Sequence, residues 1–252
     1  MSDDTAQPQS PVIELKALGK SYYRRKHKAF LVKEAVNRLL RRRAEQEKFW
    51  ALQGINLSIA AGESVALVGR NGAGKSTLLG LVAGTVYPTL GSVSVSGRVG
   101  ALLELGAGFH PDLTGSENIY LNASLLGLRK SQVDERYDRI VAFSGLEEFI
   151  DAPLRTYSSG MQMRLGFSVA AHTDPDILLM DEVFAVGDQQ FQHKCLGRME
   201  EFRAQRKTML FVGHNLETLQ GICERGVWIE HGSVRADGPF EEVRRKYDAE
   251  IH

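Results

Sequence analysis

The stretch from Gly69 to Thr77, GRNGAGKST, constrains the fold more than any other part of the sequence. It matches the pattern G-x-x-x-x-G-K-[S/T] and lies between SVALV, an apolar run typical of a buried strand, and STLLGLVAG, which is typical of a helix. The glycines let backbone N–H groups close around a phosphate chain, and the start of the helix adds positive potential. A chance match in an ordinary glycine-rich turn is the alternative. The flanking strand and helix favour a phosphate-binding loop in an α/β fold.

The residues of this loop predict an ATP site that also uses Mg²⁺. Lys75 is expected to reach the β- and γ-phosphates, and the Ser76 hydroxyl is expected to bind Mg²⁺. The remaining expected ATP contacts within the loop are Gly69, Arg70, Asn71, Gly72, Ala73, Gly74 and Thr77.

A pair of acidic residues follows a second apolar run, in ILLMDE at positions 177–182. Asp181 therefore comes at the carboxyl end of a predicted strand, where open α/β sheets place their ligands. We expect Asp181 to hold Mg²⁺ through water and Glu182 to be the base that polarises the attacking water. Such a pair is otherwise a cap or a turn, but a phosphate loop in the same chain favours catalysis.

His214 ends the next predicted strand, in LFVGHN. A lone histidine is more often structural than catalytic. Here the neighbouring strand end is expected to be that of Asp181 and Glu182, so the sequence predicts a contact between His214 and the γ-phosphate.

Short apolar strands alternate with helices in the second half of the chain and indicate a parallel sheet covered on both faces. The strands expected there are 176–181, 208–214 and 226–232, and the helices are 160–172, 189–206, 215–224 and 239–250. In the first half, strands over 12–23, on both sides of Gly62, and over 92–105 with a break at Gly97 suggest an added antiparallel layer. Two more helices, over 115–128 and 131–146, are each expected to begin at a capping serine.

The charges balance, with 31 basic and 31 acidic residues, which argues against a nucleic-acid partner. Basic residues nevertheless concentrate in residues 24–48, a segment of helical pattern with Arg41, Arg42 and Arg43 near its end. One interpretation is a helical insertion that is exposed to solvent. The other is that these arginines meet anionic lipid head groups or a glycolipid pyrophosphate. Cys195 and Cys223 have no metal-binding spacing and are expected to be reduced thiols.

The order of the motifs resembles the nucleotide-binding subunits of ABC transporters: GRNGAGKST, then YSSGMQMR, ILLMDE, AVGD and GHN. The resemblance implies a P-loop NTPase with a RecA-like core, an antiparallel β subdomain and an α-helical subdomain over about 115–172. It covers 12–252, and the polar residues 1–11 are expected to be a disordered tail. The resemblance also implies a homodimer in which the loop of Ser158, Ser159, Gly160 and Met161 contacts ATP held by the partner.

Three further site features follow from this resemblance. The loop Tyr157–Met161 differs from the usual Leu-Ser-Gly-Gly-Gln at its first, third and fifth residues, and Met161 cannot replace the hydrogen bonds of glutamine. The glutamine that usually helps to bind Mg²⁺ is missing, which makes Glu104 the nearest oxygen ligand, or else a solvent-facing carboxylate. Tyr22 is expected to stack on adenine, with Tyr23 as the alternative.

The segments LLELGAGFHPDLTGSENIYLN, YSSGM and DEVFAVGD resemble the branch that exports polysaccharides. This implies an ATPase that drives a separate integral membrane permease and exports a lipid-linked glycan of the O-antigen, capsule or teichoic acid type. An ATPase of another transporter type and a soluble, non-transport ABC ATPase are the alternatives. The sequence contains no apolar run of the ~20 residues that a membrane span needs. We therefore expect a peripheral protein on the cytoplasmic face of the inner membrane.

Overall fold

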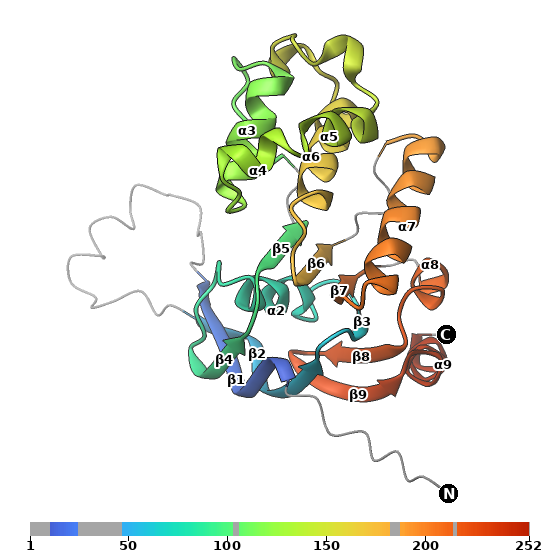
Figure 1. Cartoon of the computed structure of the whole chain (residues 1–252). Coiled ribbons are helices and arrows are strands. Elements are labelled where there is room, and N and C mark those ends of the chain that lie inside the picture. The colour runs from blue at the N-terminus through green and yellow to red at the C-terminus, as the bar shows by residue number, and fades with distance from the viewer. Residues whose placement is uncertain (1–10, 25–46, 103–105, 182–186, 214–215, 252) are drawn as a thin grey trace, which may run out of the picture.

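The computed structural model describes residues 11–24, 47–102, 106–181, 187–213 and 216–251, arranged as two sheets and several groups of helices (Figure 1). In Figure 1 the helices α3 to α6 form one group at the top of the view, and α7, α8 and α9 lie at the right. The smaller sheet and α2 lie on the opposite side from α7 and α9. None of the described helices combines the length and the apolar composition that crossing a bilayer requires.

The smaller sheet is antiparallel and has the strand order β2-β1-β4. Its strands are β1 (Pro11–Arg24), β2 (Glu47–Ala60) and β4 (Leu90–Val95). Ile13 and Leu15 alternate with Glu14 and Lys16 in β1, so one face is apolar and packs on the core. The expected antiparallel layer is confirmed.

Two expectations about the ends of this sheet are wrong. Residues 24–48 were expected to be helical, but the pairing of β1 with β2 continues from Tyr23↔Lys48 to Arg24↔Glu47. Cross-strand pairing thus overrides the local helical pattern at both ends of the segment 24–48. Residues 25–46, which include the three arginines, lie outside the described residues. Pro11 pairs with Ala60 and therefore belongs to the sheet, not to the tail.

The larger sheet has six strands in the order β5-β6-β7-β3-β8-β9, all parallel to their neighbours except β9. Its strands are β3 (Ser64–Val68), β5 (Val99–Leu102), β6 (Ile177–Asp181), β7 (Thr208–Val212), β8 (Arg225–Glu230) and β9 (Ser233–Pro239). The predicted strand over 92–105 is divided between the two sheets as β4 and β5. β9 was not predicted from the sequence.

The continuous apolar runs of this sheet follow from burial on both faces. In β3, Val65 and Leu67 pack in a core shared with the antiparallel sheet and α2 (Lys75–Val82), whereas Ala66 and Val68 pack in a second core on the opposite face. The second core includes residues of α7 (Gln189–Ala204), α8 (Leu216–Gln220) and α9 (Phe240–Ile251). The parallel sheet with two covered faces is therefore confirmed.

A third core lies within the group α3 to α6 and joins these helices to one another. The helices and short turns of the group are α3 (Gly115–Leu125), α4 (Lys130–Asp134), α5 (Tyr137–Ser144), η1 (Glu147–Phe149), η2 (Leu154–Thr156) and α6 (Ser159–Ala171). The serine caps expected for 115–128 and 131–146 are wrong. Thr114 caps α3 in a reciprocal capping box with Glu117, and the second stretch is two helices, of which the first begins after Arg129.

The two cysteines lie in the second core as free, buried thiols. Burial raises the pKa of Cys195 and of Cys223 to about 12. Because the thiolate is the reactive form, both are unreactive at neutral pH.

Candidate functional site

The loop between β3 and α2 has a backbone that only glycine accepts at key positions. Gly69, Gly72 and Gly74 have φ angles of 152°, 81° and 111°. A Cβ on Gly69 would lie 2.2 Å from the carbonyl oxygen of Ile229, and one on Gly74 would lie 2.6 Å from that of Ala51. The glycines therefore let the loop pass close to β8 and β2, and α2 begins directly after Gly74.

Lys75 is the first residue of α2 and is only 6% exposed. Its Nζ donates hydrogen bonds to the carbonyl oxygens of Gly69 at 2.6 Å and of Arg70 at 3.0 Å. The ammonium group is thus held against the loop, where backbone N–H groups and the start of α2 also favour a negative charge.

The hydroxyl of Ser76 lies 3.0 Å from Oδ2 of Asp181. Ser76 is the second residue of α2 and is exposed, while Asp181 is the last residue of β6 and is half-buried. Both side chains offer hard oxygen donors, which is the donor chemistry that Mg²⁺ prefers. Among the described residues no group of three His, Cys, Asp or Glu converges. A Mg²⁺ ion at this place would therefore take a hydroxyl oxygen from Ser76 and a carboxylate oxygen from Asp181, and phosphate oxygens would be its further ligands.

A pocket of about 560 Å³ opens beside this pair. It is lined by the loop, by one end of the antiparallel sheet and by two strand ends of the larger sheet, through Tyr22, Phe49, Ala51, Asn71, Gly72, Gly74, Lys75, Ser76, Thr77, Asp181 and Val212. Of the remaining loop residues, Gly69 and Arg70 contribute the carbonyls that hold Lys75. Ala73 is buried and bonds the backbone of Arg70 and Gly232.

Two aromatic residues line one side of the pocket. Tyr22 of β1 pairs with Phe49 of β2, and both side chains are about half exposed. Tyr23, the alternative to Tyr22, is not among the lining residues, because successive side chains of a strand point to opposite faces. Phe49 was missed by sequence analysis. Its position depends on the register of β1 against β2, which the sequence does not give.

The second predicted ATP-binding segment lies at the start of α6 and does not line this pocket. Ser158 is the N-cap of α6, and its hydroxyl accepts a hydrogen bond from the N–H of Met161 at 3.2 Å. Ser158 and Ser159 are exposed, and Gly160 and Met161 are half-buried. The exposed first turn of a helix presents N–H groups that have no partner within the helix.

Tyr157, directly before this cap, has a structural role. Its ring is buried in the third core, and its hydroxyl donates to the carbonyl of Phe149 at 2.6 Å. Burial raises the pKa of this phenol, which stays protonated and keeps its donor at all ordinary pH. Tyr157 thus anchors the start of α6 to the helices beside it.

Three predicted site residues, Glu104, Glu182 and His214, lie outside the described residues. Asp181 precedes Glu182 in the chain, and Val212, two residues before His214, lines the pocket. The strand ends that lead to Glu182 and His214 are therefore adjacent, since β6 pairs with β7 through Asp181↔Val212.

Comparison with known proteins adds independent findings. The family model described as "ABC transporter" matches residues 52–185. The O-antigen export system ATP-binding protein RfbB of Klebsiella pneumoniae is 56% identical over 200 residues, which cover 79% of this chain and 81% of that protein. The teichoic acids export ATP-binding protein TagH of Enterococcus faecalis is 42% identical over 204 residues, 81% of this chain and 45% of that protein.

Two solved structures have a similar fold. One is titled "Structure of ATP binding subunit of ABC transporter" and has a TM-score of 0.75 at 25% identity, covering 94% of this chain and 93% of that chain. The other is the dimeric structure of the bacterial ABC transporter cassette MJ0796. It has a TM-score of 0.71 at 22% identity, with 90% of this chain and 98% of that chain covered.

Proposed function

This chain belongs to the ABC transporter family, and on that premise we propose that it is the ATP-hydrolysing subunit of a polysaccharide exporter. The cargo is a lipid-linked glycan of the O-antigen, capsule or teichoic acid type, moved across the cytoplasmic membrane. The observation that carries the export assignment is the 56% identity to an O-antigen export ATP-binding protein over most of both chains.

The ATPase chemistry is proposed from the loop and the strand ends around the pocket. The Lys75 ammonium and the N–H groups of the loop stabilise the charge that develops on the transferred phosphoryl group. Mg²⁺, when bound, neutralises charge on the phosphate oxygens, and Ser76 and Asp181 would hold it. Glu182 is proposed to position and polarise the attacking water, and His214 to contact the γ-phosphate. The last two assignments come from the sequence.

We propose that two copies form a head-to-tail dimer on two ATP molecules. The first turn of α6, with Ser158 and Ser159 exposed and Gly160 and Met161 half-buried, supports this arrangement, because it offers N–H groups and hydroxyls away from the pocket of its own chain. In the dimer these groups contact ATP held by the other subunit. The same proposal takes the chain from Pro11, the first paired residue of β1, to residue 252 as one ATP-binding domain, with about 115–172 as its helical part.

The partner that crosses the membrane is proposed to be a separate permease, with this chain peripheral on the cytoplasmic side. A pull-down from native membranes tests the proposal, using tagged Glu182→Gln with ATP and Mg²⁺, because loss of the base should trap the ATP-bound dimer. We expect a membrane protein with several spans and a lipid-linked glycan to co-purify, and neither to be enriched with Lys75→Ala as control. An ATP-dependent dimer found only in the soluble fraction would contradict the transport assignment.

A further inference from the structure

The turn between β8 and β9 lies beside the phosphate loop. β8 pairs in parallel with β3, so the end of β8 continues next to the loop that follows β3. Two residues, His231 and Gly232, form the turn, and the pair Glu230↔Ser233 closes it. Both turn residues have a positive φ, 45° and 77°, which is typical of two-residue hairpin turns. The turn therefore has a defined shape where it meets the loop.

Gly232 is buried and forms backbone hydrogen bonds in two directions. Its N–H donates to the carbonyl oxygen of Ala73 in the phosphate loop at 3.0 Å, and its carbonyl oxygen accepts from the N–H of Gln53 in β2 at 2.8 Å. At the start of the loop, Gly69 passes against Ile229, three residues before Gly232. The end of β8 and its turn therefore support the loop at two points, and Gly232 also connects the loop to β2.

The carbonyl oxygen of Ala51 in β2 lies between two glycines that are distant in the chain. A Cβ on Gly74 of the phosphate loop would lie 2.6 Å from this oxygen, and a Cβ on Gly232 would lie 2.7 Å from it. The Cβ on Gly232 would also lie 3.1 Å from Cα of Leu52. The loop, β2 and the turn thus pack backbone against backbone, which glycine permits. A side chain at position 232 would push β2 away from the turn.

The same part of β2 forms one wall of the pocket. Phe49 and Ala51 line the pocket from this strand and are called the β2 wall below. The phosphate loop and the start of α2 supply most of the other lining residues, and Gly232 is not one of them. Its bonds to the loop and to β2 therefore affect the spacing between two walls of the pocket without a contact of its own to what the pocket holds.

We propose that Gly232 is a positioning residue for ATP binding. It sets the spacing between the phosphate loop and the β2 wall, so that one nucleotide contacts both at once. When two contacts are joined in one ligand, the affinity gained from the second contact is lost if the geometry forbids both together. A ligand that contacts the loop alone does not depend on this spacing. The inference rests on the proposed function, and it assigns to Gly232 no contact with nucleotide.

The chain offers two matched controls in Gly62 and Gly91. Their φ angles are 79° and 73°, against 77° for Gly232, and neither lines the pocket. A Cβ on Gly62, in the turn between β2 and β3, would lie 3.2 Å from the carbonyl oxygen of Arg206. A Cβ on Gly91 of β4 would lie 2.3 Å from that of Lys16. The two contacts bracket the 2.7 Å of Gly232, so alanine at the three positions separates loss of stability from loss of ATP binding.

The test compares Gly232→Ala, Gly62→Ala and Gly91→Ala in the full chain. The measurements are KM and kcat for ATP, the inhibition constant of inorganic tripolyphosphate, which has no base, and the melting temperature. We expect Gly232→Ala to raise KM for ATP at least tenfold, while kcat and the inhibition constant stay within about threefold. The two controls should lower the melting temperature but keep KM within about threefold of the wild type.

A second measurement uses the wild-type chain and so does not depend on the folding of a variant. Amide hydrogen exchange is followed at Gly232 and Gln53 with Mg²⁺ and a non-hydrolysable ATP analogue, or with Mg²⁺ and tripolyphosphate. We expect the analogue to slow exchange at both amides at least threefold, and tripolyphosphate to slow it at Gly232 alone.

Three results would overturn the proposal. They are a KM for ATP in Gly232→Ala that is no higher than in the controls, an equal loss of affinity for ATP and for tripolyphosphate in that variant, and unchanged exchange at both amides with the analogue. Absence of ATPase activity in the wild-type chain would instead count against the proposed function.

Discussion

The hydroxyl of Ser76 and the carboxylate of Asp181 meet at 3.0 Å although they are 105 positions apart in the chain. They meet because the phosphate loop connects the end of β3 to the start of α2, and β6 ends at the same edge of the same sheet. Only β7 separates β3 from β6 in the sheet. The start of α2, which follows β3, can therefore contact Asp181, the last residue of β6.

The first prediction concerns the Mg²⁺ dependence of ATP hydrolysis. Ser76→Ala removes one of the two oxygen donors, so the Mg²⁺ concentration at half-maximal rate should rise at least tenfold. Ser76→Thr keeps the hydroxyl and should stay within about threefold of the wild type. The measurement is the ATP hydrolysis rate of each variant over a series of Mg²⁺ concentrations. An unchanged Mg²⁺ requirement in Ser76→Ala would contradict the assignment of this pair.

The second prediction concerns the glycines of the loop. Gly69→Ala should destabilise the chain by roughly 3 kcal/mol or more, because the new Cβ would lie 2.2 Å from the carbonyl oxygen of Ile229. Gly72→Ala has nothing within 4 Å of its Cβ and only the cost of a positive φ, about 1–2 kcal/mol. Urea unfolding of both variants measures the difference. Equal loss of stability would show that the approach to β8 is unimportant.

The third prediction concerns the aromatic side of the pocket. Tyr22→Ala should raise KM for ATP about tenfold with little change in kcat, since stacking on a base is worth about 1–3 kcal/mol. Tyr22→Phe keeps the ring and should behave like the wild type. Tyr23→Ala is the matched control, because Tyr23 is next in β1 but does not line the pocket. A rise in KM with Tyr23→Ala equal to that with Tyr22→Ala would disprove the choice between them.

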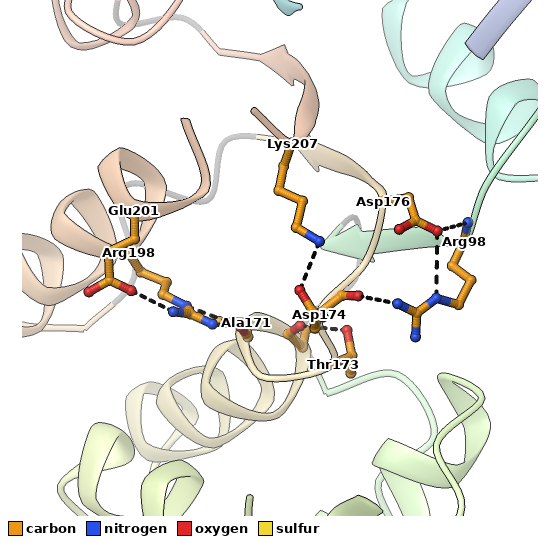
Figure 2. A network of polar contacts seen from close by, with 9 residues as sticks. Arg98, Ala171, Thr173, Asp174, Asp176, Arg198, Glu201 and Lys207 are labelled. Atoms are coloured by element: carbon orange, nitrogen blue, oxygen red, sulfur yellow. Dashed lines mark hydrogen bonds and ion pairs between the residues drawn. The ribbon is translucent and has the colours of Figure 1, made fainter. Parts of the chain in front are cut away.

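The fourth prediction concerns acid stability and the turn between α6 and β6, drawn in Figure 2. The hydrogen bond from Lys207 to Asp174, with the nearby charges of Lys207 and Arg98, lowers the pKa of Asp174 below its ordinary value of 3.8. A carboxylate with a lowered pKa in the folded state stabilises the fold above its unfolded pKa. That stabilisation is lost as the pH falls through the folded pKa.

Asp174→Asn should therefore lower the free energy of unfolding at neutral pH by up to about 1 kcal/mol, since the ion pair is partly exposed. It should also make the loss of stability below about pH 4 less steep. Asn accepts the left-handed backbone of this position, where φ is 52°, so the substitution tests the charge alone. Lys207→Met should likewise make the loss of stability below about pH 4 less steep. Wild-type steepness in both variants would contradict this account.

The sequence predicted those parts of the site that depend on one strand and the residues after it. The phosphate loop and Asp181 are examples, because their places follow from a strand, a turn and a helix that are adjacent in the chain. The α/β class and the antiparallel layer followed from hydrophobic periodicity, whereas the RecA-like core and the helical subdomain followed from the resemblance to ABC transporter subunits. The Thr114 cap was also readable, since Thr114 and Glu117 form a capping-box pattern, but the neighbouring Ser116 was preferred to it.

The rest depends on register and on contacts between distant segments. Phe49 lines the pocket only because β1 and β2 pair in one register. Similarly, Arg164 of α6 forms an ion pair with Asp188, the N-cap of α7, only because α6 and α7 pack together. β9 was missed because its alternating, largely exposed residues lack the apolar run by which the parallel strands were found. No local pattern encodes these relationships.

The most direct test of the central claim is the location of the glycan in cells that carry Lys75→Ala in place of the wild-type chain. Surface labelling of intact cells, compared with labelling after lysis, measures the exported and retained fractions. We predict that the lipid-linked glycan is still made but accumulates inside, with the surface fraction reduced at least tenfold. Surface glycan at the wild-type level, together with loss of ATP hydrolysis by the purified variant, would contradict the claim that this ATPase drives export.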